Sequence, residues 1–108
     1  NVALIDLNQM TNVLFNSMGD GPYKKAFVHY PAGTFPGQKA DFADNTHFNT
    51  FGAYEVAKCV ITGIIKAVPE IATHLKPGFS FDPKTPDSFD SFKWNLSPFY
   101  EIEKPDGN

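Results

Sequence analysis

The sequence of 108 residues contains no arginine, and all nine of its basic residues are lysines. Phosphate and nucleic-acid sites usually rely on guanidinium groups and a basic face, so this absence and a net charge of −3 argue against nucleic-acid binding. The single cysteine, Cys59, excludes an internal disulfide framework and a multi-cysteine zinc site. No apolar run approaches the ~18 residues of a membrane-spanning helix, so no membrane partner is expected.

Hydrophobic residues make up 42% of the sequence, too many for a disordered tail. Residues 2–7 are almost continuously apolar, which is typical of a strand buried on both faces of a parallel sheet. Such a strand needs neighbours on both edges, yet residues 26–30 form the only other predicted strand, and two strands do not make a stable sheet. We therefore expect this chain to be the C-terminal portion of a larger α/β domain. The missing N-terminal half, or self-association, should cover the exposed strand.

Two longer helices are predicted from the spacing of apolar residues. The first covers about residues 8–18 and ends at Gly19. The second begins near Asn49 and ends before Pro69, which should open a short helix. One stripe of the second helix is apolar and is expected to face the core; it comprises Ala53, Val56, Ala57, Val60, Ile61, Ile64 and Ile65.

The C-terminal residues 76–108 are rich in proline and aromatic residues and show no helical or strand pattern. We expect them to form an extended tail packed on the domain of residues 1–75. The aromatic residues that would anchor it are Phe79, Phe81, Phe89, Phe92, Trp94, Phe99 and Tyr100. A sugar-stacking platform around Trp94 is the alternative, although anchoring is the simpler interpretation.

The segment ahead of the second helix carries the most informative polar residues. Asp44 precedes His47 by three residues in what reads as a polar loop, a spacing that brings the two side chains within reach. Asp44 could accept a hydrogen bond from Nδ1 of His47 and leave Nε2 free as a base. On spacing alone, a capped helix start with an incidental histidine is the favoured interpretation.

Residues 44–49, Asp-Asn-Thr-His-Phe-Asn, and Gly52-Ala53 at the start of an apolar helix resemble the last block of the SGNH (GDSL-type) hydrolases. In that block an Asp-x-x-His pair completes a serine triad. Residues 29–32, His-Tyr-Pro-Ala, and 35–37, Phe-Pro-Gly, are closer to the rhamnogalacturonan acetylesterases, which remove acetyl groups from pectin. The resemblance covers roughly residues 2–75.

This resemblance implies a three-layer α/β/α, flavodoxin-like fold in which Asp44 orients His47 and His47 deprotonates a serine. The family's Gly-Asp-Ser nucleophile segment and its oxyanion donors have no counterpart here, so this chain alone is expected to be inactive. The implied substrate is an acetylated polysaccharide or another ester, and the implied location is extracellular or periplasmic. No cofactor is implied.

Two alternatives remain open at this stage. A general GDSL lipase or acylhydrolase would keep the fold and change the ester, whereas a catalytically silent binding or assembly module would have Asp44 and His47 pointing apart. Asp41 and His29 could join this pair as metal ligands, but nothing fixes three ligands at a recognisable spacing, so no metal is expected. His29 is more simply a packed, hydrogen-bonded residue.

Overall fold

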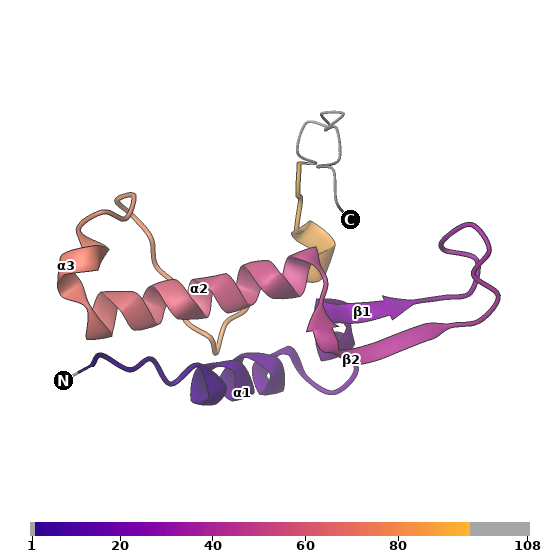
Figure 1. Ribbon diagram of the computed structural model, residues 1–108, viewed down its shortest axis with the longest axis horizontal. Helices are drawn as coiled ribbons and strands as arrows, with labels where there is room; N and C mark the ends of the chain where they lie inside the picture. Colours follow the sequence, from indigo (N-terminus) through magenta and orange to yellow (C-terminus); the bar gives the residue numbers. More distant parts are fainter. Residues whose placement is uncertain (1, 96–108) are drawn as a thin grey trace, which may run out of the picture.

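The computed structural model describes residues 2–95. Two helices lie side by side, and a β-hairpin projects from one end of the pair (Figure 1). The elements in chain order are α1 (Leu7–Met18), the 3-10 helix η1 (Pro22–Ala26), β1 (Phe27–Tyr30), β2 (Phe42–Phe48), α2 (Thr50–Ala67), α3 (Pro69–Ala72) and the 3-10 helix η2 (Phe89–Ser91). None of the described helices is long and apolar enough to cross a membrane.

The predicted helix α1 is confirmed. Its N-terminus is capped by Asp6, whose side chain accepts a hydrogen bond from the backbone N–H of Gln9 at 2.9 Å. The helix ends at Gly19, which has φ of 88°, a left-handed conformation that glycine adopts without steric cost. Leu14 is its buried residue.

The predicted buried strand at residues 2–7 is wrong. Residues 2–6 have no regular secondary structure, Leu7 begins α1, and Val2 and Leu4 are 96% and 85% exposed. A parallel strand needs a neighbour to satisfy its backbone groups. Within residues 2–95, β1 and β2 pair only with each other, so this apolar run has no strand to join.

The sheet is a two-stranded antiparallel hairpin, not the parallel sheet that was expected. The described chain therefore mixes helices with a small sheet, which is compatible with an α/β fold but does not itself form three layers. Tyr30 pairs with Phe42 and Val28 with Asp44, and then Phe27 pairs with Phe48. Residues 45–47 have no partner in this register, so they form a bulge in β2.

The polar segment ahead of α2 is thus a strand, not the loop that the sequence predicted. The prediction failed because strand β2 is largely exposed and carries few of the apolar residues that mark a strand. Only the unpaired bulge at residues 45–47 has the irregular character expected of a loop.

Helix α2 begins as predicted, but its buried face differs from the predicted one. The buried residues are Phe51, Gly52, Glu55, Cys59 and Gly63. The apolar stripe from Ala53 to Ile65 is half-buried or exposed, with Ile65 40% exposed. The small residues turn inward because α2 approaches its neighbours closely: a Cβ at Gly52 would lie 1.9 Å from the carbonyl oxygen of Ala26.

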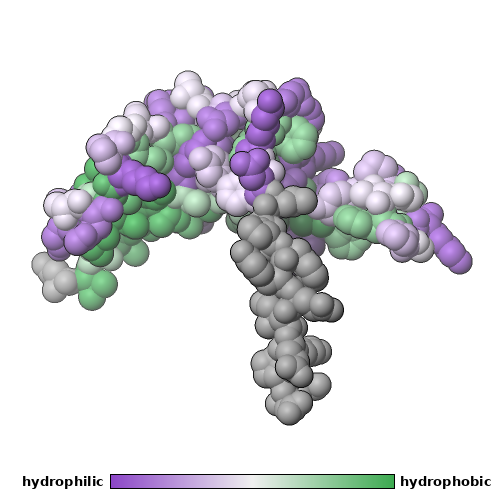
Figure 2. Space-filling model, turned by 90° about the horizontal axis from the view of Figure 1, so that it is seen from above, coloured by the Kyte–Doolittle hydropathy of each residue, from purple (hydrophilic) through white to green (hydrophobic). Residues whose placement is uncertain are grey.

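Apolar side chains consequently gather on the surface of the helical end of the molecule. Figure 2 shows a continuous hydrophobic surface over the part that contains α3 and the end of α2, and a smaller one over the hairpin. Exposed large apolar residues there include Val2, Leu4, Ile65, Ile71, Phe35 and Phe42.

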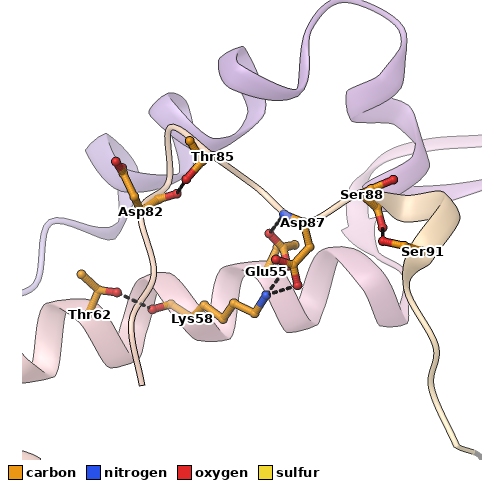
Figure 3. Close-up of polar contacts among 8 residues, drawn as sticks. All are labelled: Glu55, Lys58, Thr62, Asp82, Thr85, Asp87, Ser88 and Ser91. Carbon is orange, nitrogen blue, oxygen red and sulfur yellow. Dashed lines mark hydrogen bonds and ion pairs between the residues drawn. The ribbon is translucent and has the colours of Figure 1, made fainter. Parts of the chain in front are cut away.

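The chain after α3 returns along α2 to the N-terminal end of that helix (Figure 1). Aromatic contacts of the expected kind are present: the rings of Phe89 and Phe92 lie 5.4 and 5.3 Å from that of Phe51. Phe99 and Tyr100 lie outside the described residues. Aromatic contacts are not the whole attachment, because an ion-pair network also joins the returning segment to α2 (Figure 3).

Candidate functional site

Asp44 and His47 are in direct contact. Nδ1 of His47 lies 2.7 Å from Oδ2 of Asp44, so the hydrogen bond expected from their spacing is present. The side chain of Asp44 is 21% exposed and that of His47 is 77% exposed. The carboxylate therefore lies against the hairpin, and the imidazole projects into solvent.

The bulge in β2 creates this contact. Oδ1 of Asp44 accepts hydrogen bonds from the backbone N–H groups of Thr46, at 2.6 Å, and of His47, at 2.9 Å. Residues 45–47 have no partner residues in β1, so the Asp44 carboxylate accepts the two N–H hydrogen bonds that a paired strand would otherwise accept. One oxygen of Asp44 thus shapes the turn, and the other holds the ring of His47.

These hydrogen bonds fix the charge of Asp44. The N–H groups of His47 and Thr46, followed by the imidazole of His47, lower the pKa of Asp44 from 3.8 to about 2. The carboxylate is therefore ionised near neutral pH and can only accept a hydrogen bond, so Nδ1 of His47 must be the donor. In a neutral imidazole this leaves the lone pair on Nε2, the arrangement that a general base needs.

His29 braces the same bulge from β1. Its Nε2 lies 2.8 Å from Oδ1 of Asn45, the first unpaired residue of the bulge. This contact agrees with the interpretation of His29 as a hydrogen-bonded structural residue. Asp41 is occupied elsewhere, since its carboxylate accepts from the N–H of Ala32 at 2.8 Å. Within residues 2–95, no three His, Cys, Asp or Glu side chains are arranged to hold a metal ion.

Asn49 connects the hairpin to α2, a role that the sequence did not reveal beyond helix capping. Its Oδ1 accepts from the N–H of Gly52 at 3.0 Å. Its Nδ2 donates to the carbonyl oxygens of Lys25, at 2.6 Å, and Phe27, at 3.0 Å. Asn49 follows His47 by two residues, so this side chain fixes the position of the histidine-bearing end of β2 against the helix.

A second polar cluster, Glu55, Lys58 and Asp87, was not anticipated. Glu55 is fully buried, and its Oε1 accepts from Nζ of Lys58 at 2.8 Å. Nζ also donates to the carboxylate of Asp87, whose backbone N–H donates to Oε2 of Glu55 at 3.2 Å (Figure 3). Burial alone would lower the pKa of Lys58, but the hydrogen bonds to Asp87 and Glu55 outweigh it and raise that pKa.

One sequence signal could have found this cluster. Glu55 lies three residues after Gly52 and four before Cys59, so it shares their face of α2. A charged residue between two small ones on the inward face of a helix must be paired. Cys59 itself is buried as expected, and burial, with the nearby charge of Glu55, raises the pKa of its thiol.

The matched part of the chain is homologous to part of a carbohydrate esterase. Rhamnogalacturonan acetylesterase RhgT of Bacillus subtilis (strain 168) is 38% identical to it over 74 residues. The match covers 68% of this chain and 32% of the relative, so it spans about a third of the relative's length. No family model matches the chain, and no solved structure matches it.

Proposed function

We propose that this chain is the C-terminal catalytic segment of a serine carbohydrate esterase of the SGNH type, which removes acetyl groups from rhamnogalacturonan or a related pectic polysaccharide. The observation that carries this proposal is the 2.7 Å contact between Nδ1 of His47 and Oδ2 of Asp44. A silent module would have been favoured by side chains that diverge, and these two do not. The homology to an acetylesterase supplies the reaction class.

In this proposal His47 acts as the general base. Its Nε2 takes the proton of a serine hydroxyl as the serine oxygen bonds to the acetyl carbonyl carbon. The imidazolium then gives that proton to the sugar oxygen as the carbon–oxygen bond of the ester breaks. Water, activated by the same imidazole, cleaves the acetyl-serine and releases acetate. Asp44 keeps Nδ1 protonated and stabilises the imidazolium throughout.

The serine would come from a polypeptide segment outside this chain, corresponding to the family's Gly-Asp-Ser block. The same segment would supply the flavodoxin-like sheet, which residues 2–95 do not form, and would cover the apolar residues of 2–7 and the stripe from Ala53 to Ile65. The enzyme would act in the extracellular or periplasmic space, where its polymeric substrate is accessible.

The test measures acetate release from acetylated rhamnogalacturonan by the full-length protein that contains this chain. His47→Ala should lower kcat by about a thousand-fold or more and leave KM nearly unchanged, because the base acts on the reacting atoms and not on sugar binding. His74→Ala is the matched control, since His74 is an exposed histidine beyond α3 and should have full activity. The proposal fails if both variants retain full activity, or if long-chain acyl esters are hydrolysed in preference to acetyl esters.

A further inference from the structure

An open cavity of about 570 Å³ lies beside the N-terminal half of α2. Its lining residues are Tyr54, Asp87, Ser91, Phe92, Lys93, Trp94 and Asn95. The three aromatic rings form one cluster: the ring of Trp94 lies 5.8 Å from that of Tyr54 and 6.2 Å from that of Phe92, and Phe92 lies 5.5 Å from Tyr54. We call these three residues the aromatic platform.

Anchoring of the returning chain explains only part of this platform. Phe92 contacts Phe51 in the core, so it secures the segment to α2. Trp94 stacks on Phe92 with an interplanar angle of 19° and is nevertheless 53% exposed. Tyr54 is 41% exposed. An indole used only as an anchor would bury its area, whereas this one presents apolar surface to the cavity.

Polar groups surround the apolar faces. The carboxylate of Asp87 is held in place by Nζ of Lys58, which is itself paired with the buried Glu55. The hydroxyl of Ser91, the ammonium of Lys93 and the amide of Asn95 complete the lining. Apolar walls with a few placed polar groups are the usual composition of a small-molecule site. A sugar ring matches it, since its C–H face is apolar and its edge carries hydroxyl groups.

The platform lies near the candidate catalytic pair. From His47 the chain passes through Phe48 and the cap residue Asn49 and then makes five helical steps to Tyr54, which places the Cα atoms of His47 and Tyr54 within about 14 Å of each other. A polysaccharide chain could therefore extend from the imidazole to the platform.

From these observations we infer that the cavity is a carbohydrate subsite, in which a pectic sugar stacks on Trp94 and a uronic acid carboxylate pairs with the ammonium of Lys93. This inference rests on the proposed function for its ligand class and deepens it by assigning a substrate-holding site separate from the catalytic pair.

The experiment titrates the full-length protein that contains this chain with a deacetylated rhamnogalacturonan oligosaccharide, and saturable binding is expected by calorimetry. Calorimetric titration of variants follows. Trp94→Ala should weaken binding about tenfold or more, as truncation of a central aromatic contact does, whereas Trp94→Phe should keep most of the affinity. Lys93→Ala should remove the part of the affinity that depends on salt concentration.

Phe35→Ala is the matched control, because Phe35 is an aromatic residue of the hairpin and is 52% exposed, about as much as Trp94. The Phe35→Ala variant should bind the oligosaccharide with unchanged affinity. Circular dichroism confirms that each variant is folded. The inference is overturned if no saturable binding occurs, or if Trp94→Ala binds as tightly as the unchanged chain, or if it is weakened no more than Phe35→Ala. The probe has no acetyl group, so binding by a full-length protein that lacks esterase activity would reject the proposed function alone. Esterase activity of the full-length protein without binding of the probe would reject the subsite alone.

Discussion

The carbonyl oxygen of Ala26 and the α-carbon of Gly52 are in such close approach that no side chain fits between them: a Cβ at Gly52 would lie 1.9 Å from that oxygen. This contact seats the start of α2 on the end of η1. The contact also positions the candidate site. The 3-10 helix η1 continues into β1, which pairs with β2, and His47 lies in β2 just before α2.

Gly52→Ala should therefore destabilise the chain by about 3 kcal/mol, since the obstacle is backbone and cannot rotate away. Urea denaturation measures the change in the free energy of unfolding. Gly63→Ala is the matched control. Its Cβ would meet the side chain of Ile5, which belongs to the irregular N-terminal segment and can move. Equal stability losses in the two variants would contradict this explanation.

Asn49→Ala should cost about 2 kcal/mol of stability. It removes the cap of α2 and leaves the carbonyl groups of Lys25 and Phe27 without their side-chain donor. Asn49→Asp keeps the acceptor for Gly52 but not the donors, so its cost should be intermediate. Asn12→Ala, which removes an exposed pair on α1, should change stability by less than about 0.5 kcal/mol. Thermal or urea unfolding distinguishes the three.

Lys58→Met should be among the most damaging single changes, at about 3 kcal/mol, because it leaves the buried carboxylate of Glu55 without its cation. Adding Glu55→Gln to that variant should recover much of the loss, since the unpaired charge is then gone. Lys25→Met breaks an ion pair whose side chains are 48% and 79% exposed, so it should have little effect. If Lys25→Met lowered the free energy of unfolding as much as Lys58→Met does, burial of the Glu55 carboxylate would not explain the effect of Lys58→Met.

The lowered pKa of Asp44 has a stability consequence with a definite sign. Because the folded-state pKa is about 2 and the reference value is 3.8, the contribution of this carboxylate is fully present above about pH 4 and is lost as the pH falls through 2. The stability difference between the unchanged chain and Asp44→Asn should therefore shrink between pH 4 and pH 2. Carbon-13 NMR titration of the carboxyl group should give a midpoint near 2, and a midpoint near 3.8 would show that the hydrogen bonds are not formed in solution.

Local features could be predicted from the sequence, and features that depend on distant partners could not. Helix α1 was recognised because its cap, apolar spacing and terminal glycine are all encoded within a few residues. The spacing of three also brought Asp44 and His47 within reach of each other, but the bulge in β2 that creates their contact was not predicted.

The failures share a physical cause. The apolar run at residues 2–7 indicates burial, but whether it becomes a strand depends on neighbours that residues 2–95 do not supply. The stripe on α2 was expected to face inward because it is apolar, whereas close packing at Gly52 and Gly63 decides which face turns in. The pairing of Glu55 with Asp87 crosses 32 residues, beyond the reach of any periodic pattern.

The short range of the Asp44–His47 contact also bears on the order of events during folding. Loops of ten residues close in ~10–100 ns, and the hydrogen bonds that shape this bulge join Asp44 to residues only two and three positions away. The link between Glu55 and Asp87 requires a much longer closure and carries a larger entropic cost. In the proposed enzyme we therefore expect the acid–base pair to form before the segment that holds the nucleophile packs against it.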